Sequence, residues 1–180
     1  MRKQTFKNIF FVLTVILILL PFLTTFSEQL TGLIQKTPLY LLIQAYIVPY
    51  EVRIVGLIMS LLRIPVEVGT SSLSVAGQPL RVTWNCLGWQ SLLFLLVSLS
   101  AGLQGSFKLS SKLEVVTIGI LGTFWVNILR IVFISILGGY FPSVFAVVFH
   151  DYFATLVTAV WLFIFWWFSF SFVLEERDAD

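Results

Sequence analysis

The feature that most constrains this chain is a series of long apolar segments that carry almost no charge. Residues 113–138 and 144–173 each exceed the roughly 20 residues that an α-helix needs to cross a bilayer, and residues 8–27 and 86–103 are similarly apolar. Lipid offers no partner to backbone N–H and C=O groups, so such segments must be helical. Only 11% of the 180 residues are charged, too few to cover a soluble domain. The sequence therefore predicts a single integral membrane domain.

The N-terminal segment allows two interpretations. Arg2, Lys3 and Lys7 precede the apolar run 8–27, as basic residues precede the apolar core of a secretory signal peptide. However, no A-x-A-like cleavage site follows in "TTFSEQL", and the run is long enough to span the bilayer. We expect a retained transmembrane helix here.

Charge and cysteine content exclude several classes of protein. A net charge of +2 is too small to indicate a nucleic acid partner. The single cysteine excludes an intrachain disulfide and a zinc-finger framework. Cys86, His150 and Asp151 would make a thin ligand set for a metal ion, so we expect neither a metal nor another cofactor.

Residues 39–64 are apolar enough to cross the membrane but carry charge at their centre. Pro49, Glu51 and Arg53 lie there, and charge within lipid is costly. A helix on the membrane surface would keep these charges in water. The fold class predicted from the sequence is an all-α membrane bundle with four transmembrane helices and this surface helix, and five transmembrane helices are the alternative.

Residues 65–85 change character and predict a small β-hairpin. Apolar residues alternate with polar ones on both sides of a four-residue turn, Ala76-Gly77-Gln78-Pro79. The alternating apolar positions are Val66, Val68, Leu73, Val75, Leu80, Val82 and Trp84. An isolated hairpin cannot lie in lipid with unpaired edges, so we expect it at the aqueous, extracytoplasmic face, just before the cysteine.

Three reactive side chains are predicted to lie at one depth. Cys86 stands at the entrance of its span, and the next span returns from the opposite side. From Leu113 to Arg130 a helix rises roughly 25 Å, which brings Arg130 back near the level of Cys86. His150 lies a turn or two inside the last span, roughly 10 Å from its start, at the same side. The segments 86–103, 113–138 and 144–173 thus carry the cysteine, the arginine and the histidine.

These residue types have the chemistry of acyl transfer through a thioester. A helix N-terminus and a nearby Arg130 would favour the Cys86 thiolate, and His150 would act as general base or acid. Asn127 lies three residues before Arg130, on the same helical face. Simpler roles remain open, because a lone membrane cysteine is often an apolar filler and a histidine at a helix start is often interfacial.

Two other functions remain open on the residues alone. In a non-enzymatic assembly factor or small transporter subunit, Arg130 would pair with a buried carboxylate. The carboxylates available for such a pair are Glu51, Glu67 and Asp151. A thiol-dependent lipid acyltransferase would share the cysteine chemistry but would carry a fatty acid on Cys86 instead of a peptide.

Three sequence blocks resemble the signature blocks of the exosortase/archaeosortase family of membrane cysteine transpeptidases. They are "NCLGW" at 85–89, "FWVNILRIVFI" at 124–134 and "FHDYFA" at 149–154, in the family's order and spacing. The resemblance implies that Cys86 attacks the scissile carbonyl, Arg130 stabilises the oxyanion and His150 moves the proton. Asn85, Gly88 and Asn127 would support them.

The resemblance also implies the substrate and its location. Family substrates are exported proteins whose C-terminal sorting tail has a short motif, a transmembrane helix and a basic cluster. The enzyme would cut between motif and helix at the outer face of the plasma membrane and pass the acyl group to a lipid or other envelope acceptor. Lys108 and Lys112 would then be cytoplasmic, as the positive-inside rule prefers.

Overall fold

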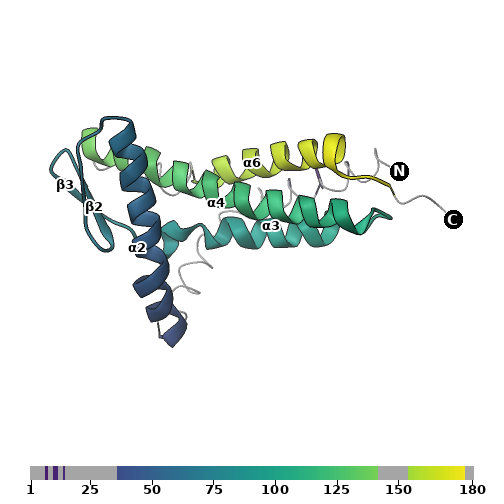
Figure 1. The fold of residues 1–180 in the computed structure, drawn as a ribbon, viewed down its shortest axis with the longest axis horizontal. Helices are drawn as coiled ribbons and strands as arrows, with labels where there is room; N and C mark the ends of the chain where they lie inside the picture. The colour runs from purple at the N-terminus through teal and green to yellow at the C-terminus, as the bar shows by residue number, and fades with distance from the viewer. Residues whose placement is uncertain (1–6, 8–9, 12–13, 15–35, 142–153, 177–180) are drawn as a thin grey trace.

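The computed structural model describes residues 7, 10–11, 14, 36–141 and 154–176. The elements are α2 (Pro38–Leu61), β1 (Val66–Val68), β2 (Ser72–Val75), β3 (Gln78–Arg81), the 3-10 turn η1 (Trp84–Leu87), α3 (Trp89–Gly102), α4 (Leu109–Tyr140), α6 (Ala154–Phe168) and the π-helical turn η3 (Ser169–Val173). Helices α3, α4 and α6 run lengthwise beside one another, whereas α2 crosses one end of this group next to the small sheet (Figure 1).

Three of the described helices are long and apolar enough to cross a membrane, which confirms a helical membrane protein. They are Tyr40–Leu61, Leu109–Tyr140 and Leu156–Val173. Helix α3 is apolar but only 14 residues long, so the predicted span 86–103 is helical over a shorter stretch than expected. Most of the predicted first helix, 8–27, and the first part of the span 144–173 lie outside the described residues.

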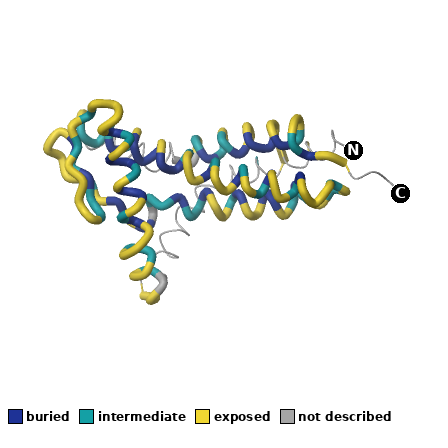
Figure 2. Tube along the Cα trace, viewed as in Figure 1, coloured by how far each residue is buried: buried dark blue, intermediate teal, exposed yellow. Residues whose placement is uncertain are grey.

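Helices α3, α4 and α6 pack through small residues and large aromatic rings. A methyl group added at Gly102 of α3 would collide with the ring of Trp166, and one at Gly122 of α4 with the ring of Trp161. Such small-residue positions let membrane helices approach closely. Buried residues lie where these helices face one another, with exposed residues on their outer sides (Figure 2).

Hydrogen bonds between side chains also join the three helices. The hydroxyl groups of Ser91 in α3 and Thr158 in α6 lie 2.7 Å apart. The indole Nε1 of Trp161 donates to Thr123 Oγ1 of α4 over 3.0 Å. These bonds satisfy polar groups that would otherwise face apolar neighbours.

A second core joins α2, the sheet and the C-terminal half of α4. Its buried residues are Val48, Val52, Val55 and Met59 from α2, Leu73, Val75 and Val82 from the sheet region, and Ile128, Ile131 and Val132 from α4. The alternation of apolar residues therefore predicted the buried positions Leu73, Val75 and Val82 correctly, whereas Val68, which follows the same pattern, is exposed. The core fixes both α2 and the sheet against the end of α4 that carries Arg130.

The predicted hairpin is wrong in two details, because the structure has three antiparallel strands in the order β1-β2-β3 and a shorter turn. Val75 pairs with Gln78, so the turn contains only Ala76 and Gly77. Their φ values of 51° and 78° suit a two-residue turn that follows the twist of the strands. Pro79 tolerates a place in β3 because this is an edge strand, where its missing N–H need not pair.

Helix α2 ends three residues earlier than the predicted boundary at residue 64. Arg63 adopts the left-handed conformation with φ 59°. The N–H of Arg63 donates to the carbonyl of Ser60 over 3.0 Å, and that of Ile64 to the carbonyl of Met59 over 2.9 Å. This is a Schellman motif, which satisfies the last helical carbonyls and turns the chain into β1.

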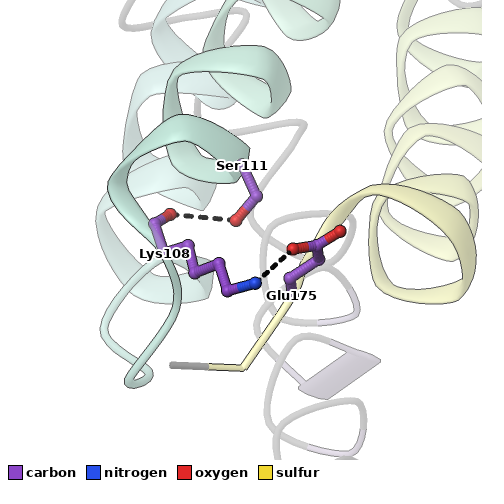
Figure 3. A network of polar contacts seen from close by, with 3 residues as sticks. All are labelled: Lys108, Ser111 and Glu175. Atoms are coloured by element: carbon purple, nitrogen blue, oxygen red, sulfur yellow. Dashed lines mark hydrogen bonds and ion pairs between the residues drawn. The ribbon is translucent and has the colours of Figure 1, made fainter. Parts of the chain in front are cut away.

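The opposite end of α4 is tied to the C-terminal segment. Lys108 Nζ donates to Glu175 Oε2 over 2.8 Å, and Ser111 Oγ donates to the Lys108 carbonyl over 2.9 Å (Figure 3). The hydrogen bond from Lys108 holds the pKa of Glu175 below its usual range. Both charged side chains are largely exposed, so the pair contributes little stability but marks a water-exposed end of the bundle.

Candidate active site

Cys86 lies in η1, just before α3, rather than at the first position of a long helix. The predicted start of the span at residue 86 is therefore corrected to Trp89. Gly88 separates the two helical turns because its φ of 70° is left-handed, a conformation that glycine adopts without steric cost. Cys86 is half-buried and packs against the core formed by α2, the sheet and α4.

Asn127 and Arg130 of α4 both bind the main-chain carbonyl of Cys86. Asn127 Nδ2 donates to this oxygen over 3.0 Å and Arg130 Nη2 over 2.9 Å. Side chains three residues apart on a helix lie on one face, so the spacing brings both to a single atom. The depth estimate is confirmed for Cys86 and Arg130, which lie at one level.

The Arg130 guanidinium keeps hydrogen-bonding capacity beyond this bond. The side chain is 8% exposed, and its Nε has no hydrogen-bond partner in the part of the chain that the structure describes. A guanidinium has five N–H donors in a fixed plane. Arg130 can therefore hold the Cys86 backbone and donate to a second oxygen nearby.

Gly88 is required by packing as well as by its backbone conformation. A methyl group at Gly88 would lie 2.5 Å from Asn127 Oδ1, well inside van der Waals contact. The space beside this glycine is thus filled by the Asn127 side chain. Gly88 lets the Asn127 amide reach the Cys86 carbonyl.

Near the thiol, Thr83 Oγ1 lies 3.8 Å from Cys86 Sγ. Trp84 and Trp89 flank the cysteine in sequence and stack with ring centroids 5.9 Å apart. The indole Nε1 atoms of both rings are buried without a hydrogen-bond partner among the described residues. The cysteine is therefore presented on a short turn that is rigidified by a stacked tryptophan pair.

Glu51 is buried at this site, which corrects the expectation that a surface helix would keep its charges in water. Arg53 is exposed as expected, but Glu51 is only 4% exposed. Its carboxyl group lies within electrostatic range of Arg130 and Cys86. The sequence carried a signal for this placement, because Glu51 shares a helical face with the apolar residues Val48, Val52 and Val55.

Arg130 has no close carboxylate partner in the described ranges 36–141 and 154–176. No carboxylate oxygen there lies within 4.0 Å of its guanidinium. Glu67 is exposed on β1, and Glu51 acts on Arg130 only at longer range. The nearest polar anchor of this buried arginine is therefore the Cys86 backbone.

The family model described as transmembrane exosortase matches residues 2–167, which is nearly the whole chain. The chain belongs to the transmembrane exosortase family. No curated protein and no solved structure gives a significant match. Exosortases are in general cysteine transpeptidases that act on exported proteins with C-terminal sorting signals.

Part of the predicted exosortase site lies outside the described residues. His150 and Asp151 fall in the segment 142–153, and the side chain of Asn85 is likewise not described. The structure therefore brings together Cys86, Asn127 and Arg130. The position of His150 stays a prediction from the sequence.

Proposed function

We propose that this exosortase is a membrane cysteine transpeptidase that removes the C-terminal sorting signal of exported proteins and transfers them to a second acceptor. The observation that carries the proposal is the pair of hydrogen bonds from Asn127 and Arg130 to the Cys86 carbonyl. They hold the cysteine turn against a buried cation that has donors to spare. An oxyanion forming beside Cys86 Sγ would meet this cation.

The reaction then proceeds in two acyl transfers. His150 takes the proton from the Cys86 thiol, and the sulfur attacks the scissile carbonyl to form a tetrahedral oxyanion, which Arg130 stabilises. The C–N bond breaks, His150 gives its proton to the leaving amine, and the acyl group remains on sulfur as a thioester. A nucleophile on a lipid or envelope acceptor attacks the thioester, transfers its proton and releases Cys86.

The substrate tail would approach along the membrane. A sorting motif that lies just outside its own transmembrane helix reaches the membrane at one leaflet, which suits a cysteine at the end of the α3–α4–α6 bundle. We place this end, with α2 and the sheet, on the extracytoplasmic side of the plasma membrane. Lys108 and Lys112 at the opposite end would then be cytoplasmic. In this arrangement the enzyme is multi-pass and α2 lies along the surface.

Two alternatives have less support. A scaffold protein would neutralise the buried arginine with a carboxylate in direct contact, whereas Arg130 binds a main-chain carbonyl. A lipid acyltransferase would use the same thiol, but membership of the exosortase family favours a peptide acyl group. The acyl group carried by Cys86 separates the two enzymatic functions.

The test follows tail removal in membranes that contain this protein and a host protein bearing a candidate sorting tail. Gel shift and mass spectrometry would compare the wild type with Cys86→Ala and Cys86→Ser. We expect the wild type to process the tail and Cys86→Ala to process none, because the thiol is the nucleophile. Equal processing by both proteins would make Cys86 a packing residue and would refute the proposal.

A further inference from the structure

The outer face of α2 is a stripe of large apolar side chains that no described element covers. It lies opposite the inner face of the helix, where Val48, Val52 and Val55 pack into the core with α4 and the sheet. A spacing of three or four residues places the members of the outer face on one side of the helix. They are Leu42, Tyr46, Tyr50, Arg53, Leu57 and Leu61, all exposed, and each apolar member is more than half exposed. A contiguous apolar surface of this length marks a contact with a membrane or a partner.

The outer face of α2 is also basic. Arg53 lies near its middle, Lys36 and Arg63 flank the helix, and all three are exposed. Glu51, the only carboxylate in residues 36–65, is buried. Within the described ranges 36–141 and 154–176, no carboxylate oxygen lies within 4.0 Å of these three cations. The face therefore presents positive charge that nearby carboxylates do not neutralise.

The distances between the cations indicate an extended anionic partner. Helix α2 has 24 residues and is therefore roughly 36 Å long, with Lys36 and Arg63 beyond its two ends. One small anion cannot contact charges spread over this length, whereas a layer of lipid headgroups can. A second copy of this chain fits poorly, because a twofold contact through α2 would bring these cations against the same cations of the other copy.

The residue types on the outer face match the interface of a bilayer. Tyrosine is enriched where the hydrocarbon core meets the headgroups, and arginine can lay its aliphatic stem on apolar surface while its guanidinium reaches a phosphate. Because α2 crosses the end of the bundle (Figure 1), it lies near headgroup depth in the proposed arrangement. Apolar burial and attraction to anionic lipids act together on a helix of this kind.

We propose that the outer face of α2 is a binding surface for anionic phospholipid headgroups, with its tyrosine and leucine side chains in the interfacial layer and Arg53 on a lipid phosphate. The inference goes beyond the proposed function and takes from it only the surface position of α2. Cys86 packs against the core that holds the inner face of the helix. Lipid binding and the thiol therefore use opposite sides of α2.

The test measures which lipids contact the middle of this face in the full-length protein, reconstituted into proteoliposomes. In a Cys86→Ala background, Tyr50→Cys would carry the small aromatic fluorophore bimane, one helical turn from Arg53. Quenching by brominated phosphatidylglycerol is compared with quenching by brominated phosphatidylcholine at equal mole fraction. We expect phosphatidylglycerol to bind about two- to fivefold more tightly at low salt. The preference should fall towards parity at about 1 M salt, which screens the charges.

Charge variants and a second label position provide the matched controls. Arg53→Gln should lower the preference about twofold or more, and Arg53→Lys, which keeps the charge, should retain it within about 1.5-fold. Lys112→Gln, near the opposite end of α4, should leave it unchanged. Bimane at Leu96→Cys, an exposed apolar position on α3, a helix without charged residues, should show no preference between the two lipids.

Several results would overturn the proposal. They are equal binding of the two lipids next to Arg53, a preference that persists in Arg53→Gln/Arg63→Gln, and the absence of quenching by either lipid. Stronger quenching by bromines near the chain ends than by bromines near the headgroup would also overturn it, because it would place Tyr50 in the middle of the bilayer. Every arm uses Cys86→Ala and measures lipid contact, so a failure here is distinguishable from a failure of the transpeptidase function.

Discussion

Cys86 is held in this exosortase through its main chain. Two donors from one face of α4, Asn127 and Arg130, bind its carbonyl oxygen. The sequence predicted that these two residues share one face of their helix and that Arg130 lies at the depth of Cys86, because helix geometry fixes both. It did not predict that they bind the cysteine's own backbone, because the contact depends on the turn that Gly88 introduces between η1 and α3.

Replacing Arg130 tests the role of the guanidinium. We expect Arg130→Gln to lower kcat for tail processing by about 100- to 1000-fold, the usual effect of removing an oxyanion donor. Arg130→Lys should restore only part of the activity, because an ammonium lacks the planar fork that reaches two oxygens at once. Steady-state kinetics in proteoliposomes would measure both.

The control for this prediction is Arg53→Gln, which removes an exposed arginine from α2 and should leave kcat unchanged. A loss of activity in Arg130→Gln that is confined to KM would contradict the role, since an oxyanion donor acts in the transition state. Equal losses in the two arginine variants would contradict it as well.

Gly88 and Gly77 form a matched pair of variants that measures the free-energy cost of crowding Asn127 with a methyl group at position 88. Both have positive φ, so alanine costs about 1 kcal/mol at either position. Only at Gly88 does the added methyl group meet a buried side chain, which adds about 1–3 kcal/mol. We expect Gly88→Ala to lower the free energy of unfolding by roughly 2–4 kcal/mol and Gly77→Ala by about 1 kcal/mol.

Titration with SDS in mixed micelles would give these free energies. Equal losses of unfolding free energy in the two glycine variants would mean that Asn127 moves aside without cost. Gly88→Ala should also slow tail processing, whereas Gly77→Ala, at a solvent-exposed turn, should not.

Among the elements, α2 differs most from what its composition indicates. It is long and apolar enough to span a membrane, yet it crosses the end of the bundle formed by α3, α4 and α6 (Figure 1). Hydropathy measures only the cost of transfer into lipid, so it cannot distinguish a spanning helix from one that packs across an end. The charges at its centre favoured the surface position, although one of them, Glu51, is buried against α4.

Labelling of the two ends of α2 tests its orientation. Lys36 and Leu62 flank the helix and are exposed. In a Cys86→Ala background, we expect Lys36→Cys and Leu62→Cys to react with a membrane-impermeant maleimide from the same side of the membrane, because a surface helix keeps both ends there. Intact cells and inverted vesicles provide the two sides. Opposite sidedness would show that α2 spans the bilayer.

The sheet shows where local sequence signals were sufficient. Alternating apolar residues predicted the strands over 66–84, and the buried residues Leu73, Val75 and Val82 follow this alternation. The turn was predicted two residues too long, because Gln78 and Pro79 were taken as loop residues. Pairing of β3 at the sheet edge overrides that preference and admits the proline.

In the whole molecule, two packed regions share α4. One joins α4 to α3 and α6, and the other joins it to α2 and the sheet. The 32 residues of α4 extend roughly 48 Å, longer than the hydrocarbon core of about 30 Å. From Leu109 to Arg130 the helix rises roughly 32 Å, so a membrane around the first region leaves the cysteine site at its edge.

The sequence predicted this layout in outline. The length of the apolar segments indicates the membrane helices, and the helical rise per residue gives the depth of Arg130. The sequence could not predict the interhelical fit of Gly102 against Trp166 or of Gly122 against Trp161, because such contacts depend on which helices are neighbours. Helical periodicity places Glu51 on one face with Val48, Val52 and Val55, but which element covers this face depends on the crossing of α2 over α4.

The most direct test of the central claim is the mass of the acyl group on Cys86 during turnover. Membranes that contain the wild-type protein and a tailed substrate would be quenched in acid, and the peptide that contains Cys86 analysed by mass spectrometry. We predict a hydroxylamine-sensitive adduct whose mass matches the substrate cut at its sorting motif, absent in Cys86→Ala. A fatty acyl adduct on Cys86 would contradict the account. So would tail removal that leaves no adduct on Cys86 and that continues in Cys86→Ala.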